Sequence, residues 1–134
     1  MPAGQAQKEF FLNQTICLLD ALMVRAVISS LDAPPPEAAE GECYRVLDGA
    51  TGEWGSNDRS IAVKIGGGWH FVSPSLGMQV FDRESRCWFQ FDGDWFAAVA
   101  PPSAEGGATV DQEARTAIAQ LVEALRSVGI FGQN

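Results

Sequence analysis

A Gly-x-Trp tripeptide occurs three times in this chain and constrains its fold more than any other feature. The copies are Gly52-Glu53-Trp54, Gly67-Gly68-Trp69 and Gly93-Asp94-Trp95, each after a short run of β-forming residues. Glycine accepts the positive φ of a tight turn, and a large aromatic residue on the returning strand can pack across a hairpin. The repeat therefore predicts three hairpins of similar design.

The second and third copies align beyond the tripeptide. Each is preceded by three apolar residues at alternate positions: Ile61, Val63 and Ile65 before one Trp, and Cys87, Phe89 and Phe91 before the other. Alternation of this kind indicates strands. Residues 43–100 read as short strands divided by Gly, Asp, Asn and Ser clusters. They predict a small antiparallel β meander or barrel-like domain.

The register of the second hairpin has two alternatives. A turn at Gly66-Gly67 places Lys64 opposite Trp69 and turns the indole away from the apolar face. A three-residue turn at 66–68 instead places Ile65 opposite Trp69 and makes the ring part of the core. We favour the core register, because a small β domain needs large side chains to fill its interior.

The third hairpin poses the same choice. A turn at Asp92-Gly93 pairs Gln90 with Trp95, whereas a turn at 92–94 pairs Phe91 with Trp95 and buries the indole. Trp88 is a separate case, because it alternates with its apolar neighbours and must point to the second face of its strand. At least one large aromatic ring in this strand is therefore expected on that face.

A helix and a proline-rich connector are expected over residues 1–42. Apolar residues recur at steps of three and four from Asn13 to Ser29, namely at Ile16, Leu19, Leu22, Met23, Ala26 and Val27. This spacing predicts an amphipathic helix with Asn13 as N-cap, ended by Pro34-Pro35-Pro36. Asp20 and Arg25 interrupt the apolar run, so neither a signal peptide nor a membrane span is expected.

A linker over residues 101–109 leads to a predicted helix over 110–134. Thr109 and Gln112 have the spacing of a capping box. The seam Ala114, Ile118, Leu121, Leu125 and Val128 follows heptad steps. Such a helix either packs on its own domain or associates with other copies, and two heptads leave both alternatives open. The whole chain is thus expected to be α+β, with a helix at each end of the β region.

Charge and cysteine usage exclude several function classes. The net charge is −8 with only nine Lys and Arg among 134 residues. Nucleic acid and anionic membranes need concentrated positive charge, so neither is an expected partner. Cys17, Cys43 and Cys87 are odd in number and widely spaced, which suits neither a disulfide framework nor a metal knuckle. We expect no metal and no cofactor.

Exposed indoles are the main candidates for ligand binding. An aromatic ring can lie against the C–H face of a sugar while nearby carboxylates or amides bind hydroxyl groups. The candidate carbohydrate-binding residues are Trp54, Trp69, Trp88, Trp95, Asn57, Asp58, Asp92 and Asp94. Their structural alternative is core packing for the indoles and turn formation for the Asn and Asp residues.

Evidence for catalysis is thin. His70 is the only histidine and has no adjacent Ser or Cys nucleophile. Asp92 and Asp94 sit on one tight turn, where paired carboxylates more often solvate the turn than act as acid and base. A non-enzymatic role is therefore expected.

Several segments carry a likeness to a known domain family: Pro2-Ala3-Gly4-Gln5-Ala6-Gln7-Lys8-Glu9, Asn13, Leu18-Leu19-Asp20-Ala21-Leu22, Glu40-Gly41-Glu42-Cys43-Tyr44 and Gly49-Ala50-Thr51-Gly52-Glu53-Trp54. Over residues 2 to about 100 the chain resembles DUF2793, an uncharacterised family. Its members occur in structural gene clusters of bacterial prophages and gene transfer agents. The last helix lies outside the likeness.

The resemblance implies a component of a head spike or tail fibre. Such a protein is made in the cytoplasm and leaves the cell in a phage-like particle. Adhesion to the recipient's surface polysaccharide is the usual proposal for such components, and a homo-oligomer would strengthen weak sugar contacts through avidity. The alternative is a structural adaptor that docks another particle protein.

Overall fold

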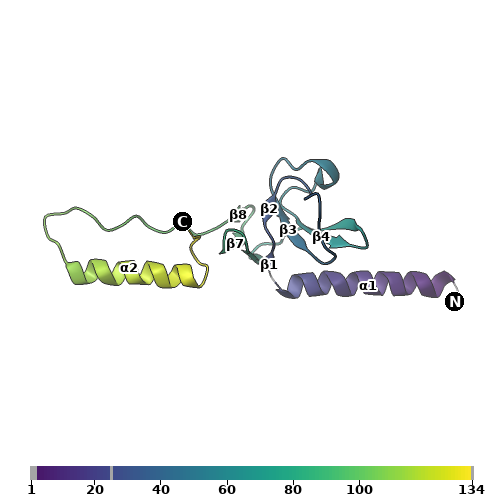
Figure 1. Ribbon diagram of the computed structural model, residues 1–134, viewed down its shortest axis with the longest axis horizontal. Coiled ribbons are helices and arrows are strands. Elements are labelled where there is room, and N and C mark those ends of the chain that lie inside the picture. Colours follow the sequence, from purple (N-terminus) through teal and green to yellow (C-terminus); the bar gives the residue numbers. More distant parts are fainter. Residues whose placement is uncertain (1–2, 25, 134) are drawn as a thin grey trace.

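The computed structural model describes residues 3–24 and 26–133. A long helix comes first, eight short strands follow, and a second helix lies near the end (Figure 1). The elements are α1 (Ala3–Val24), β1 (Ala26–Val27), β2 (Ser30–Leu31), β3 (Cys43–Val46), the 3₁₀ helix η1 (Gly52–Trp54), β4 (Ile61–Ile65), β5 (Gly68–Val72), β6 (Gln79–Asp82), β7 (Cys87–Phe91), β8 (Trp95–Phe96) and α2 (Gln112–Ser127). The α+β prediction is confirmed.

The strands form two sheets of the same design. Sheet A has the order β1-β6-β7-β8 and sheet B the order β2-β3-β4-β5. Each contains a three-stranded antiparallel meander, and each meander is extended by one short parallel strand. Both parallel strands come from residues 26–31. The purely antiparallel expectation is therefore wrong, and neither sheet closes into a barrel within the described residues.

The two Gly-x-Trp hairpins have different registers. Gly66 and Gly67 form a two-residue turn with φ of +61° and +77°, which pairs Lys64 with Trp69. The core register favoured for this hairpin is thus wrong. Positive φ at both central residues suits a hairpin turn whose twist matches that of the strands. In the third copy Phe91 pairs with Trp95, so the register that buries the indole is right there.

The first Gly-x-Trp copy forms no hairpin, which corrects the expectation of three. Gly52, Glu53 and Trp54 form η1 instead. The amide of Trp54 donates to the Thr51 carbonyl at 3.3 Å, and that of Gly55 donates to Gly52 at 3.2 Å. These bonds close a helical turn, so no returning strand follows the tryptophan.

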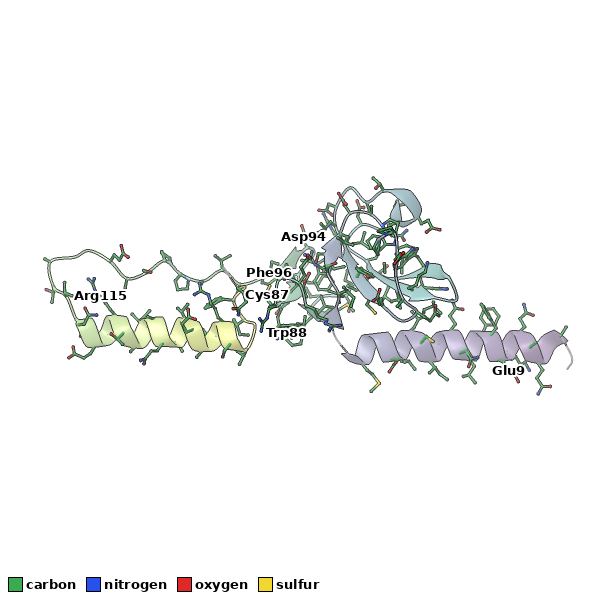
Figure 2. The ribbon with its side chains drawn as sticks, viewed as in Figure 1. Glu9, Cys87, Trp88, Asp94, Phe96 and Arg115 are labelled. Carbon is green, nitrogen blue, oxygen red and sulfur yellow. The ribbon has the colours of Figure 1, made fainter. Side chains whose placement is uncertain are left out.

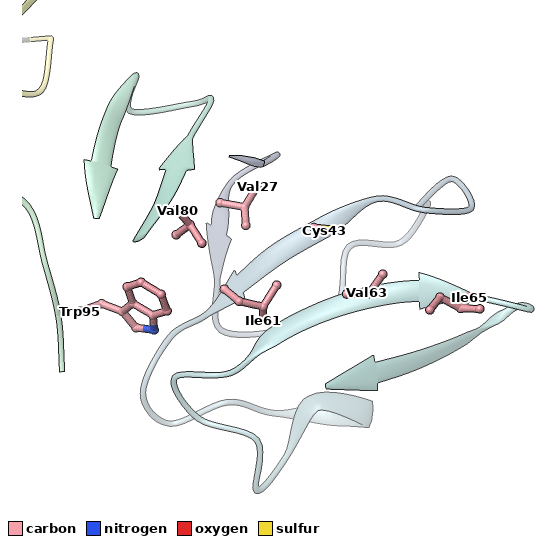
Figure 3. Packing of buried hydrophobic residues seen from close by; sticks show 7 residues of the cluster. All are labelled: Val27, Cys43, Ile61, Val63, Ile65, Val80 and Trp95. Carbon is pink, nitrogen blue, oxygen red and sulfur yellow. The ribbon is translucent and has the colours of Figure 1, made fainter. Parts of the chain in front are cut away.

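The main core lies between the two sheets (Figure 3). Its buried members are Val27, Cys43, Ile61, Val63, Ile65, Val80 and Trp95. A second cluster covers the other face of sheet B and consists of Tyr44, Val46, Trp54 and Ala62. Sheet B is therefore buried on both faces, which explains why β3 is buried along its whole length.

The N-terminal helix is longer and begins earlier than the sequence indicated. It starts at Ala3, so Asn13 is an interior residue and not the N-cap. It ends at Val24, where residues expected to continue the helix instead form β1 and pair with β6. Its residues Cys17 and Leu18 pack on the main core. Gln14 of the same helix places its Nε2 2.7 Å from His70 Nδ1. Pairing with a sheet has overridden local helical periodicity here.

The C-terminal helix forms an arm on the side of the sheets opposite α1 (Figure 1). Its N-cap is Asp111, whose carboxylate accepts from the Ala114 amide at 2.9 Å, so the expected capping role of Thr109 is wrong. After α2 the chain returns to the sheets, where the Trp88 amide donates to the Gly129 carbonyl at 2.8 Å. Within the described ranges, no helix is long and apolar enough to cross a membrane.

Candidate functional site

The four tryptophans fall into two groups. Trp54 is 0% exposed and Trp95 is buried, whereas Trp69 and Trp88 are half-buried. Trp95 Nε1 donates to the Arg59 carbonyl at 2.7 Å, which fixes the ring in the interior. The assignment of Trp54 and Trp95 to a carbohydrate site is therefore corrected, because a glycan cannot reach either ring in the folded domain.

Trp69 is covered on more than one side. Its ring lies edge-on to Trp54 and Tyr44, with centroids 5.0 and 5.9 Å away. The Lys64 ammonium lies 4.9 Å from the centre of the same ring, because the two residues pair across the hairpin. A cation over an indole face is itself stabilising, so a sugar ring would have to displace Lys64 to stack there.

The candidate polar residues serve turns. Asp58 accepts hydrogen bonds from the amides of Gly49 and Ala50 at 3.2 and 3.0 Å. Asn57 donates to the Gly55 carbonyl at 3.1 Å. Both residues fix loop backbone in the manner expected of Asn and Asp.

The third hairpin carries the other two candidate carboxylates, Asp92 and Asp94. Asp94 accepts from the Trp95 amide at 2.8 Å and lies 3.7 Å from Arg59 Nε, which also pairs with Asp48 at 2.9 Å. Asp92 is exposed and its amide donates to the Asp94 carbonyl. The Asp94 carboxylate thus lies beside buried Trp95, and among the described residues neither carboxylate has a hydrogen bond or ion pair to Trp69 or Trp88.

Trp88 borders a groove that the sequence did not indicate. The indole pairs with Phe81 across sheet A, at 5.3 Å between centroids, and lies where the sheets meet the end of α2 (Figure 2). The groove measures about 360 Å³ and is lined by Phe81, Arg86, Trp88, Arg126, Ser127, Val128, Gly129 and Gln133.

Two guanidinium groups give this groove its charge. Arg126 Nη1 lies 2.6 Å from Glu123 Oε1, and its buried Nε has no hydrogen-bond partner among the described residues. Arg86 lies on the turn before β7 and is exposed. Arg126 comes from α2, about forty positions further along the chain, so no local pattern links it to Trp88. An aromatic ring beside guanidinium groups suits a ligand that carries carboxylates.

A second cleft, of about 540 Å³, lies between α1 and the segment before β3. Its chemically distinctive lining residues are Cys17, Asp20, Glu40, Glu42, Cys43 and Arg83. Burial, with a smaller effect of the Asp20 carboxylate, raises the pKa of the Cys43 thiol to about 11. That thiol keeps its proton at neutral pH, which makes it a poor nucleophile and a poor metal ligand. In the described part of the chain, no three or more His, Cys, Asp or Glu side chains are placed so that they could hold a metal ion together.

The seam expected on the C-terminal helix is open to solvent. Ile118, Leu121 and Val128 are exposed and Leu125 is half-buried. A groove of about 530 Å³ separates α2 from its own linker, and it is lined by residues 101–105 and by α2 residues that include Ile118. None of the described residues of α2 is buried, so the helix does not pack its seam on its own sheets.

Comparison with known proteins identifies one family. The sequence profile described as "Protein of unknown function (DUF2793)" matches residues 12–97, more than half of the chain. The match runs from the middle of α1 through β8 and leaves out both α2 and the Gln5-Ala6-Gln7-Lys8-Glu9 element. No curated protein matches the chain.

Proposed function

We propose that this chain, which belongs to the DUF2793 family, is a structural subunit of a phage-like particle. The proposed position is a head spike or tail fibre of a prophage or gene transfer agent. The resemblance of residues 2 to about 100 to products of such gene clusters supports this context. In this role the chain forms a homo-oligomer through α2, and its sheets are presented to the outside.

The exposed seam on α2 carries this proposal. Ile118 and Leu121 on α2, and Val128 at its C-cap, are large apolar residues that are 47%, 61% and 60% exposed. An amphipathic helix of this kind is stabilised when its apolar stripe is covered. The described residues of the same chain cover this stripe only in part, so other copies are the proposed cover.

Sedimentation of the full chain tests this assembly. The Ile118→Lys/Leu121→Lys double variant places charges on the seam and should lower the average mass at every concentration. Gln120→Lys is the matched control, because Gln120 is exposed on the same helix but lies off the seam. An unchanged mass in the double variant would contradict the α2 interface.

An adaptor role gives a different pattern of results. An adaptor would be monomeric alone and would co-purify with a neighbouring particle protein when the two are expressed together. The adaptor role is therefore favoured over the homo-oligomer if the wild-type chain is monomeric at all accessible concentrations and co-purifies with this partner.

Attachment to an acidic cell-surface polysaccharide is the second candidate function. The observation that favours it is the groove at Trp88, where Arg86 places positive charge and Arg126, which also pairs with Glu123, adds a second guanidinium group in a chain of net charge −8. A half-buried indole supplies a stacking surface, and the guanidinium groups supply carboxylate binding.

Binding to immobilised polysaccharides tests the attachment. We expect retention on acidic polysaccharides, weaker retention as salt rises, and no retention on neutral ones. Arg86→Asn should reduce affinity on the order of 10-fold, since a charge-assisted contact is lost while Asn tolerates the positive φ of this position. Arg83→Gln, an exposed arginine outside the groove, is the control. Equal losses in both variants would mean nonspecific charge attraction.

A further inference from the structure

The N-terminal helix exposes more large apolar side chains than its own domain covers. The exposed ones are Phe10, Phe11, Leu12, Ile16, Leu19 and Met23. Scattered apolar residues are normal on a protein surface, whereas a contiguous set on one helix marks an interaction surface. What distinguishes this set is the order of four of its members along the helix.

Leu12, Ile16, Leu19 and Met23 follow steps of four, three and four residues, which form a continuous stripe along an α-helix. We call these four residues the outer seam. Towards the N-terminus the same spacing reaches Glu9, which is charged. The outer seam is therefore a defined patch of roughly 17 Å along the helix.

The outer seam faces away from the sheets. Among the α1 side chains that the structure describes, Gln14, Cys17 and Leu18 contact the sheets. At about 100° per residue, the average direction of these three positions lies roughly 180° from that of the outer seam. A second helix can therefore pack on the outer seam without touching the sheets of the first molecule.

The residue types select the kind of partner. In heptad notation Ile16 occupies an a position, and Leu12 and Leu19 occupy d positions. A β-branched residue at a with leucine at d favours two parallel strands. In such a pair Asp20 at e lies opposite Thr15 at g of the other copy, so no like charges meet beside the seam. The seam is thus compatible with itself.

We infer that α1 pairs in parallel with α1 of a second copy through Leu12, Ile16, Leu19 and Met23. This inference rests on the proposed structural role and adds a second interface to the one proposed on α2. Because α1 and α2 extend on opposite sides of the sheets, the two interfaces are spatially separate (Figure 1). One molecule can engage partners at both ends.

The test uses the full chain with the α2 seam disabled by Ile118→Lys/Leu121→Lys, so that association through α1 is measured alone. We expect a concentration-dependent dimer in sedimentation equilibrium. Leu19→Lys in this background should raise the dissociation constant on the order of 100-fold, because each lysine enters an apolar seam. Phe11→Lys is the matched control, since Phe11 is 58% exposed, Leu19 is 55% exposed, and Phe11 lies off the outer seam.

Cross-linking tests the parallel arrangement. Leu19→Cys should form a disulfide-linked dimer under mild oxidation, because d positions of a parallel pair face each other within disulfide distance. Cys17→Ser is included so that the native thiol of this helix cannot react. A mixed disulfide between Leu12→Cys and Met23→Cys chains, without same-site dimers, would indicate an antiparallel pair and overturn the parallel arrangement.

Three further outcomes would overturn the inference. One is a chain that stays monomeric once α2 is disabled, and another is equal loss of dimer in Leu19→Lys and Phe11→Lys. The third is a Leu19→Lys variant that loses only a co-purifying particle protein. Failure of the α2 proposal gives a separate result, because the mass of the wild-type chain would then fall with Leu19→Lys and not with Ile118→Lys/Leu121→Lys.

Discussion

Tyr44 and Cys43 are neighbours on β3 whose side chains enter opposite faces of sheet B. Burial, supported by Glu42, raises the pKa of Tyr44 to about 12, and its hydroxyl donates to Glu42 Oε2 at 2.8 Å. Burial raises the pKa of Cys43 to about 11. Both groups hold their protons more tightly when folded than when unfolded. Their contribution to stability is therefore present at neutral pH and disappears in alkali.

Alkaline pH should unfold the protein in a window set by these residues. The stability due to Cys43 falls from about pH 9 to 11 and that due to Tyr44 from about pH 10 to 12, on the order of 2 kcal/mol for each group. Absorbance of tyrosinate reports on Tyr44 alone, because the chain has one tyrosine. Urea unfolding at several pH values should show a smaller loss above pH 10 in Tyr44→Phe. An identical loss in that variant would contradict the assignment.

Gly129 shows why the chain can return to sheet A after α2. Its φ is +78°, and a Cβ placed on it would lie 2.7 Å from Phe81 Cε2 and 3.4 Å from Trp88 Cδ1. An alanine there would have both a strained backbone and a clash.

We expect Gly129→Ala to release the C-terminal tail from sheet A at a cost of about 1–3 kcal/mol. The indole of Trp88 would then be more exposed, so its fluorescence should be quenched more strongly by acrylamide. Gly107→Ala is the control, because its φ is also positive while its Cβ would meet nothing closer than 3.9 Å. Equal quenching in the two variants would show that the clash is unimportant.

At the scale of elements, sequence spacing predicts Thr109 as the N-cap of α2, whereas Asp111 forms the cap. Both residues are plausible caps, because Thr and Asp each accept from amides of the first turn. The choice depends on where the linker enters the helix.

Asp111→Ala should destabilise α2 by about 1 kcal/mol, because the Ala114 amide loses its acceptor. Hydrogen exchange measured on peptides of α2 should speed up, while peptides of the sheets stay unchanged. Thr109→Ala should leave the exchange of α2 as in wild type. If the threonine variant shows the larger effect, the cap assignment is wrong.

The hairpins show the same limit of local prediction. Sequence spacing predicts the β4–β5 and β7–β8 hairpins. The two aligned segments occupy equivalent positions, because β4 and β5 are the last two strands of sheet B and β7 and β8 are the last two of sheet A. The two turns differ in length by one residue, so Trp69 and Trp95 point to non-equivalent faces of their sheets. Repeated sequence therefore produced repeated strands, but equivalent tryptophans acquired different environments.

At the scale of the whole molecule, residues 26–31 join the two sheets. A polar contact adds to this connection, since the Ser30 hydroxyl accepts from Arg45 Nε at 2.9 Å and also bonds to Asp82. Arg45 belongs to sheet B and Asp82 to sheet A, and both are buried. Burial lowers the pKa of Arg45, while the Asp82 carboxylate opposes this effect. The two meanders should therefore unfold together.

Ser30→Ala removes the hydroxyl between these charges and should cost about 1–3 kcal/mol. Because the contact joins the sheets, hydrogen exchange should accelerate in both β3–β5 and β6–β8. Ser75→Ala, at an exposed loop position, should change neither. Acceleration in one sheet alone would mean that the two meanders are independent units.

The sequence by itself determined the α+β class, the family, the strand region and a helix at each end. The structural features among these depend on residues close together in the chain: glycine in tight turns, proline after a helix, and alternation along strands. Only the tertiary structure decided that residues 26–31 supply a parallel strand to each sheet, that Trp54 is buried on a helical turn, and that Arg86 and Arg126 line the same groove as Trp88. Those outcomes depend on contacts between residues far apart in the chain, and such contacts leave no periodic pattern in the sequence.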